Sequence, residues 1–232
     1  MPNSVIHLYA NTRRAVGVIN ALRRGAPDSH IVVFSAPEMF DEPPYVHRIR
    51  QAADAVSADY YTIPAPFLSP RPDMILCSNW RQKIEKRVID ATPYGAFCIH
   101  DSLLPRWRGH SPLVHAIMEG DRVTGATLFR MTDMVDAGPI LSQRTVVIDQ
   151  SDSIASVMPR VDMVYYELTL MLACAFAEGR TLSEYPQDET GATVAERIDY
   201  SEDGLRIDWS WPHQRIVNFV RALAYPYPGA RA

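Results

Sequence analysis

The chain has 232 residues, of which 47% are hydrophobic and 22% are charged, and its formal net charge is −4. This length suits one large domain, or one domain with a short appendage, that can bury a full core without disulfides. The negative charge disfavours nucleic-acid binding as the main task, because such binding needs a basic surface.

The first half of the chain alternates short apolar segments with segments of helical spacing. Strands are predicted at residues 4–10, 30–36, 59–64, 73–78 and 95–100. Helices are predicted between them at residues 12–24, 44–56 and 80–91. This alternation predicts a Rossmann-like α/β fold, with a mostly parallel twisted sheet and flanking helices. No Gly-x-Gly-x-x-Gly follows the first strand, so dinucleotide binding has no support.

The second half has a different pattern. Its predicted elements are strands at 125–131 and 139–148, a long helix at 153–178 and a final helix at 211–223. Pro159 falls in the first turns of the long helix, so we expect that helix to begin later. Residues 180–210 are polar and irregular. We expect residues 1–180 to form one domain, and residues 181–232 to form a linker and the start of a C-terminal region, a short extension that could be truncated.

The cysteines, the N-terminus and the most apolar segment indicate in which cellular compartment the protein is expected. Cys77, Cys98 and Cys174 are widely spaced and form no Cys-x-x-Cys pair, so neither a zinc site nor a disulfide framework is predicted. The N-terminus shows no secretion signal, and the most apolar segment, residues 163–177, is too short to span a bilayer. We therefore expect a cytoplasmic protein that needs no metal and does not enter a membrane.

The segment from Cys98 to Gly109 is the first place to look for a functional site. Its sequence is CIHDSLLPRWRG, in which a strand ends in His100 and a loop with two leucines, a proline and two arginines follows. Ligands of open parallel sheets bind beyond the carboxyl ends of the strands. Residues 98 and 100 point to the same side of a strand, so Cys98 and His100 are expected to share one face of this crevice.

Three motifs in order resemble those of one enzyme superfamily, the 10-formyltetrahydrofolate-dependent formyltransferases. They are HDSLLPRWRG at 100–109, GAT at 125–127 and VDAGPI at 135–140. The superfamily includes methionyl-tRNA formyltransferase, glycinamide ribonucleotide transformylase and the sugar-nucleotide N-formyltransferases. The resemblance is strong over residues 73–148 and returns at 208–211 and 221–229. The first seventy residues match it only in general architecture.

The resemblance implies an Asn-x-His sequence on the strand and a distant aspartate. His100 matches the histidine and Asp136 the aspartate, whereas Cys98 stands where the asparagine is usual. The asparagine amide is thought to donate to the formyl oxygen, and a thiol is a weaker donor. Another donor would then compensate, or protonated His100 would stabilise the oxyanion alone, or activity would be reduced. Other residues also occur at this place in the branch that hydrolyses or oxidises formyl-folate.

His100 and Asp136 also suggest a mechanism from their chemistry alone, independently of the family resemblance. Formyl transfer requires an amine to attack a carbonyl carbon, a donor for the resulting oxyanion and an acceptor for the amine proton. His100 can serve both needs because an imidazole changes charge near neutral pH, and Asp136 can orient it and relay the proton. A Cys98–His100 nucleophile pair is a weaker alternative. A structural His100 and a turn-forming Asp136 are the non-functional alternatives.

By resemblance, the co-substrate is 10-formyltetrahydrofolate, held by a mostly apolar pocket. The residues expected to bind it are Ser78, Asn79, Trp80, Arg81, Ile84, Leu103, Leu104, Pro105, Met131, Met134 and Val135. The residues expected to bind the second substrate are Ser102, Arg106, Arg108, Trp209 and Tyr227. Internal pairing of the two arginines and core packing of Trp209 remain alternatives.

The expected acceptor is the amine of an amino-sugar nucleotide. Methionyl-tRNA formyltransferases add a basic linker and a C-terminal barrel, for which the sequence has no room after Gly229. The ending RALAYPYPG, at residues 221–229, is shared with tRNA and sugar formyltransferases rather than with glycinamide ribonucleotide transformylase. A methionyl-tRNA formyltransferase-like enzyme, a 10-formyltetrahydrofolate hydrolase and a folate-binding protein without catalysis remain alternatives. The oligomeric state is left open, a homodimer included.

Overall fold

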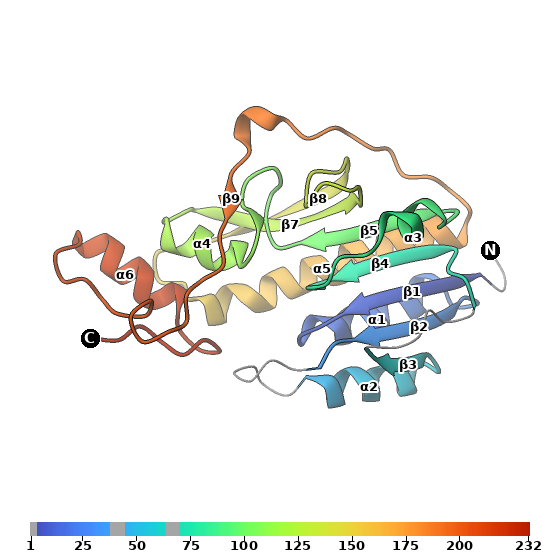
Figure 1. Ribbon diagram of the computed structural model, residues 1–232, viewed down its shortest axis with the longest axis horizontal. Coiled ribbons are helices and arrows are strands. Elements are labelled where there is room, and N and C mark those ends of the chain that lie inside the picture. The colour runs from blue at the N-terminus through green and yellow to red at the C-terminus, as the bar shows by residue number, and fades with distance from the viewer. Residues whose placement is uncertain (1–3, 38–44, 64–69) are drawn as a thin grey trace.

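The computed structural model of the chain describes residues 4–37, 45–63 and 70–232 (Figure 1). In these residues the strands of the main sheet run in the order β3-β2-β1-β4-β5-β7-β8. Their bounds are β1 (Val5–Ala10), β2 (His30–Ser35), β3 (Asp59–Thr62), β4 (Met74–Ser78), β5 (Gly95–His100), β7 (Val123–Arg130) and β8 (Ile140–Val147). The first five are parallel, while β7 and β8 pair antiparallel. The predicted mostly parallel α/β fold is confirmed.

The helices cover the two faces of this sheet unequally. They are α1 (Arg14–Gly25), α2 (Val46–Ala55), α3 (Lys86–Asp90), α4 (Pro112–Met118), α5 (Ile154–Ala177) and α6 (His213–Ala222). The main core lies between the sheet and α1, α2, α4 and α5, with α1 and α5 packed against each other. The short helix α3 packs on the opposite face, over β4 and β5. In the described parts of the chain no helix is long and apolar enough to cross a membrane.

Strand alternation decides which side chains reach each face. Leu76 and Ile99 enter the main core, whereas Ile75, Cys77 and Ala96 join a smaller cluster on the α3 face. Strands buried on both faces are expected to be apolar along their whole length, as β4 and β5 are. Because Cys98 has the same parity as Ala96, it also faces the α3 side of the sheet.

Two predicted helices differ from those observed. The helix expected at 80–91 is confined to α3, because Asn79 has a left-handed φ of 52° and Glu85 is extended, so the backbone between them cannot continue a helix. The helix α5 begins at Ile154, so the expected later start at Pro159 is wrong. The side chain of Ser156 accepts a hydrogen bond of 3.0 Å from the Ser153 backbone at the helix start. Such capping satisfies groups of the first turn, and Pro159 then removes only one helical hydrogen bond.

The chain after α5 returns along the length of the molecule. Figure 1 shows it running over the top of the view, from the end of α5 on the right to β9 (Val194–Ala195) on the left. A short 3-10 helix, η1 (Glu189–Gly191), lies within it, and β9 pairs in parallel with β6 (Arg108–Gly109). We call residues 180–195 the strap. Beyond it, α6 packs on α4 at the end toward which β1, β4 and β5 point.

Candidate active site

His100 is the last residue of β5 and lies at the carboxyl edge of the sheet, where 9% of its surface is exposed. Its Nε2 atom lies 2.8 Å from the carbonyl oxygen of Trp107, and its Nδ1 atom lies 3.6 Å from Oδ2 of Asp136. A carbonyl oxygen only accepts hydrogen bonds, so Nε2 carries a proton. A second proton on Nδ1 would face the Asp136 carboxylate. The imidazole is therefore placed to exchange a proton on its Asp136 side.

Asp136 is held in place by the loop that follows His100. Its Oδ2 atom accepts a hydrogen bond of 2.9 Å from the backbone N–H of Gly109, and its φ of 50° lies in the left-handed region. Gly109 has a φ of 100°, and a Cβ atom there would stand 2.7 Å from the carbonyl oxygen of Ala195. Glycine is therefore required where β6 passes close to β9. The close approach brings together two segments that are far apart in sequence.

An apolar cluster lies on the same face of the sheet as Cys98. Among the predicted folate-binding residues, Trp80, Ile84 and Met131 pack there with Cys98, against the side chains of Ile75, Cys77 and Ala96. The indole Nε1 atom of Trp80 is buried, and it has no hydrogen-bond partner in the described part of the chain. This cluster combines flat apolar side chains with one buried, unsatisfied donor, which suits a heteroaromatic ring that packs against it.

The structure does not gather every predicted folate contact in that cluster. Leu104 is buried, its N–H donates to Thr127 Oγ1 at 3.1 Å and its carbonyl accepts from Gln143 at 2.8 Å, so it belongs to the β7–β8 side. Its neighbours Leu103 and Pro105 lie near Gly125 and Gly191. Ser78 is buried at the end of β4, and Ser102, which was predicted to bind the second substrate, is buried just beyond β5. Met134 and Val135 are 66% and 75% exposed in the loop that carries Asp136.

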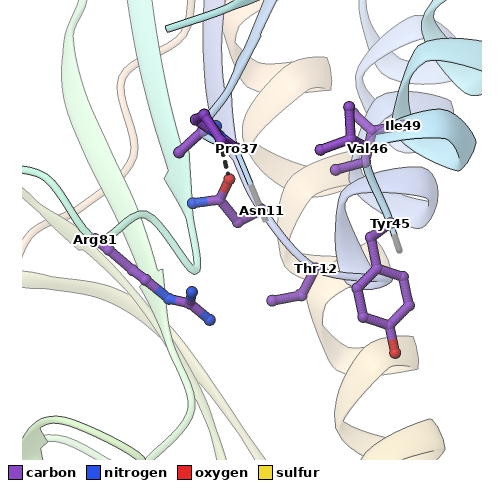
Figure 2. Close-up of a pocket in the computed structure, with 8 residues that line it drawn as sticks. Asn11, Thr12, Pro37, Tyr45, Val46, Ile49 and Arg81 are labelled. Carbon is purple, nitrogen blue, oxygen red and sulfur yellow. Dashed lines mark hydrogen bonds between the residues drawn. The ribbon is translucent and has the colours of Figure 1, made fainter. Parts of the chain in front are cut away.

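Arg81, just after β4, lines a separate pocket together with residues at the ends of β1 and β2 and at the start of α2 (Figure 2). The strand order reverses between β1 and β4, and open α/β sheets bind ligands at such a point. The Asn11 carboxamide accepts a hydrogen bond of 3.0 Å from Ala36 and donates one of 3.4 Å to the Asn79 carbonyl. Figure 2 shows the Arg81 side chain extending toward Thr12. The remaining lining residues are Ala36, Pro37, Tyr45, Val46 and Ile49.

The predicted contacts with the second substrate are partly used inside the protein. Arg106 makes two hydrogen bonds to the Asp121 carboxylate, at 2.9 and 2.7 Å. Arg108 pairs with Gln187 and Glu189 of the strap. Trp209 is 68% exposed, and the ring of Tyr227 stacks on another tyrosine, Tyr200, at 5.5 Å. For both arginines the structure shows the internal pairing that the sequence left open.

Two family models match most of the chain. The sequence model described as "Formyl transferase" matches residues 5–171, and that of the formyl transferase C-terminal domain matches residues 200–232. The chain belongs to the formyl transferase family. A methionyl-tRNA formyltransferase of Caulobacter vibrioides is 42% identical over 149 residues, which are 64% of this chain and 47% of that protein. The chain thus spans about half the length of this curated relative.

Solved structures share the fold of this formyl transferase. A 4-N formyltransferase from Francisella tularensis superposes with a TM-score of 0.77 at 17% identity, covering 98% of this chain and 91% of that one. An N-formyltransferase from Helicobacter canadensis, in complex with folinic acid and dTDP-3-aminofucose, gives a TM-score of 0.74 at 15% identity, covering 95% and 80%. At these identities the likeness establishes the fold.

Cys98 occupies a site that keeps its thiol protonated. Burial raises the pKa of Cys98 well above its ordinary value, and the nearby Cys77, Asp136 and Asp101 raise it further. A thiolate is the nucleophilic form of cysteine, so this environment disfavours the Cys98–His100 nucleophile pair. The Sγ atom lies 3.7 Å from the carbonyl oxygen of Ile99. No cluster of three metal-binding side chains occurs among the residues that the structure describes.

A buried polar network beneath the formyl transferase site was missed by the sequence analysis. The guanidinium of Arg14 pairs with the carboxylate of Asp101, the residue after His100, and the hydroxyl of Tyr165 also bonds to that carboxylate. Arg14 further donates to Asp162 at 2.8 Å. One sequence signal pointed to this network. An arginine in the first turn of a helix opposes the helix dipole, so Arg14 needed an acidic partner.

Proposed function

We propose that this formyl transferase moves the formyl group of 10-formyltetrahydrofolate to the amine of an amino-sugar nucleotide. The observation that carries the transfer step is the contact between His100 Nδ1 and Asp136 Oδ2, at 3.6 Å. It places a proton-carrying ring beside a carboxylate at the open edge of the sheet. Such a pair can accept a proton from an attacking amine and stabilise a developing oxyanion.

In the proposed step the amine nitrogen bonds to the formyl carbon, and the carbonyl oxygen becomes an oxyanion. The positive charge of a doubly protonated His100 would stabilise this oxyanion, while one N–H of the ring points to the Trp107 carbonyl and the other lies on the Asp136 side. Asp136 takes the proton that the amine releases. When the tetrahedral intermediate collapses, the bond to N10 of the folate breaks and that nitrogen receives the proton that Asp136 took from the amine. No metal takes part in this scheme.

The chain offers a surface that fits the folate co-substrate. The apolar cluster of Trp80, Ile84, Met131 and Cys98 lies on the face that His100 shares, and the unpartnered Trp80 Nε1 supplies a donor for a polar atom of the ring. The exposed Met134 and the loop that carries it would cover a bound ring. Folinic acid in the Helicobacter canadensis structure supports this assignment.

The choice of acceptor rests on two further observations. The net charge of −4 does not favour a polyanionic RNA as substrate. The folds of a 4-N formyltransferase and of an N-formyltransferase crystallised with dTDP-3-aminofucose match nearly all of this chain. The side chains of Asn11, Thr12 and Arg81 lie beyond the carboxyl ends of the strands, as His100 does, and would contact the acceptor there.

Methionyl-tRNA is the second candidate acceptor. It is favoured by the 42% identity with the Caulobacter vibrioides methionyl-tRNA formyltransferase, a value above that of either solved structure. The formyl donor would be the same for both acceptors. Which acceptor the protein uses must therefore be determined by experiment.

One assay distinguishes these functions. The protein is incubated with 10-formyltetrahydrofolate alone, with a panel of amino-sugar nucleotides, and with methionyl-tRNA. The folate is followed by absorbance, and each acceptor by mass. We expect a gain of one formyl group on an amino-sugar nucleotide. Formylation of methionyl-tRNA alone would replace the proposed acceptor. Folate turnover without any amine would indicate a hydrolase, and tight folate binding without turnover would indicate a binding protein.

A further inference from the structure

The side chain of Gln187, in the strap, joins the two loops that carry the candidate catalytic residues. Its Nε2 atom lies 2.8 Å from the carbonyl oxygen of Asp136 and 2.8 Å from that of Gly138. Its Oε1 atom lies 3.1 Å from Nε and 2.6 Å from Nη2 of Arg108. The same amide group therefore contacts both the loop that follows His100 and the loop that carries Asp136.

Only a glutamine amide satisfies this arrangement. Two carbonyl oxygens require two N–H donors, and the guanidinium of Arg108 requires an acceptor. Gln187 supplies both donors from Nε2 and the acceptor from Oε1. A glutamate of nearly the same shape would direct an oxygen at the two carbonyls and lose both hydrogen bonds. A methionine would keep the length of the side chain and lose all of the polar contacts.

The loop that Gln187 binds has an unfavourable backbone shape. Asp136 has a φ of 50°, a conformation that non-glycine residues seldom adopt without outside support. At Gly138 a Cβ atom would stand 1.8 Å from the Arg130 carbonyl oxygen, so this turn is tightly folded. The Asp136 carboxylate receives the Gly109 N–H at 2.9 Å, and Gly109 directly follows Arg108. Gln187 thus fixes both partners of the contact that orients Asp136.

We propose that Gln187 is a positioning residue for formyl transfer, which acts by holding Asp136 at its place beside His100. This inference rests on the proposed function, because Asp136 matters to the rate only if it handles the amine proton. Displacing a reacting group by about 1 Å lowers a rate by about 100-fold. We therefore expect loss of the Gln187 contacts to lower kcat by about 10- to 100-fold, with little change in the KM for 10-formyltetrahydrofolate.

Other contacts hold the strap, so a substitution at Gln187 should not release it. Tyr185 exchanges two backbone hydrogen bonds with Ile140, at 2.7 and 2.9 Å. Glu184 pairs with Arg130 at 2.5 Å. On the other side of Gln187, the Trp107 N–H donates to Thr193 Oγ1 at 2.8 Å. Because of these contacts, the strap should keep its position when Gln187 is substituted.

The test compares Gln187→Glu and Gln187→Met with Glu189→Gln as a matched control. Glu189 also pairs with Arg108, but within the described part of the chain its side chain makes no hydrogen bond or ion pair with the Asp136 loop, and it is mostly exposed. We expect both Gln187 variants to lose kcat and the control to stay within about twofold of the wild type. In an Asp136→Asn background the further loss on Gln187→Met should disappear, because the two residues act as one unit. Unchanged kcat in both Gln187 variants would overturn the inference.

A second measurement works without any activity. Exchange of the Gly109 amide proton reports its hydrogen bond to Asp136. We expect faster exchange in Gln187→Met and Gln187→Glu, and wild-type exchange in Glu189→Gln. If the wild-type protein formylates no acceptor, the proposed function fails, and this exchange then decides only whether Gln187 holds Asp136 in place. Wild-type protection in both Gln187 variants would then overturn it.

Discussion

Arg14 and Asp101 form an ion pair inside the fold, with only 5% and 13% of their side chains exposed. Burial would raise the pKa of the Asp101 carboxyl, but Arg14 and the Tyr165 hydroxyl oppose this effect, and the pKa is lowered. The Arg14 guanidinium also lies 4.9 Å over the ring of Tyr165. The carboxylate next to His100 therefore remains ionised on the helix-covered side of the sheet, and it anchors the end of β5 to α1 and α5.

Removing one charge of this pair should strongly destabilise the protein. Arg14→Met leaves the Asp101 carboxylate buried without its partner, and such changes cost about 3–5 kcal/mol. The double substitution Arg14→Met with Asp101→Leu removes both charges and should be less destabilising than Arg14→Met alone. Urea unfolding measures both. Lys86→Met breaks the exposed pair with Asp90 and should leave the stability nearly unchanged. Equal stability of Arg14→Met and the wild type would contradict this account.

The stability of the protein should fall in mild acid because of His7. Burial lowers the pKa of His7 to about 4, although its hydrogen bond to the Pro70 carbonyl acts in the opposite direction. In the unfolded chain a histidine titrates near pH 6.5. Below that pH the unfolded chain gains a proton that the folded chain binds only near pH 4. The stabilisation present above pH 6.5 is therefore lost as the pH falls toward 4.

Substitution of His7 isolates this effect from that of other groups. Between pH 7 and pH 5 the His7 contribution to the free energy of unfolding should fall by roughly 1–2 kcal/mol. His7→Phe keeps an aromatic ring beside Phe34, which lies 5.1 Å away, and removes the titration. We expect the wild type to lose more stability than His7→Phe over this range in urea unfolding. Identical losses in the two proteins would rule out a neutral buried imidazole at position 7.

Cys98 should be dispensable as a nucleophile. Its raised pKa keeps it as a thiol at neutral pH, so we expect slow alkylation by iodoacetamide at pH 7.5 in the folded protein. Cys98→Asn introduces a stronger hydrogen-bond donor on the same face as His100. We expect equal or higher formyl transfer in this variant, measured as kcat with the preferred acceptor. A large loss would mean that the thiol has a task of its own.

Much of the fold could be predicted because its strands are apolar and separated by clear helical segments. The bounds of β1, β2 and β5 fall within a residue of the predicted ones, since each is a short, largely apolar run bounded by polar or turn-forming residues. A helix was wrongly predicted over residues 80–85 because Trp80 and Ile84 have helical spacing, yet both pack on the sheet from irregular backbone. The spacing of apolar residues alone does not reveal that tertiary contacts favour an irregular backbone over a helix.

The sequence predicted those site residues that lie within recognisable motifs. It did not predict residues that reach the site only because distant segments meet in the fold. His100 and Asp136 were found from their motifs, and the structure places them in contact. Gln187 lies in a polar segment without periodicity, and its importance comes only from contacts with loops about 50 and 80 residues earlier in the chain. Arg14 and Tyr165 likewise join Asp101 only in the folded protein.

The account depends most on the pair formed by His100 and Asp136, and one comparison of rates tests it. The kcat of formyl transfer is measured for His100→Ala and Asp136→Asn, with His110→Ala as the control for an exposed histidine in the same loop. Circular dichroism verifies that each variant is folded. We predict that each of the first two substitutions lowers kcat by at least about 100-fold, and that the control stays near the wild-type rate. Near-normal turnover by folded His100→Ala would contradict the mechanism.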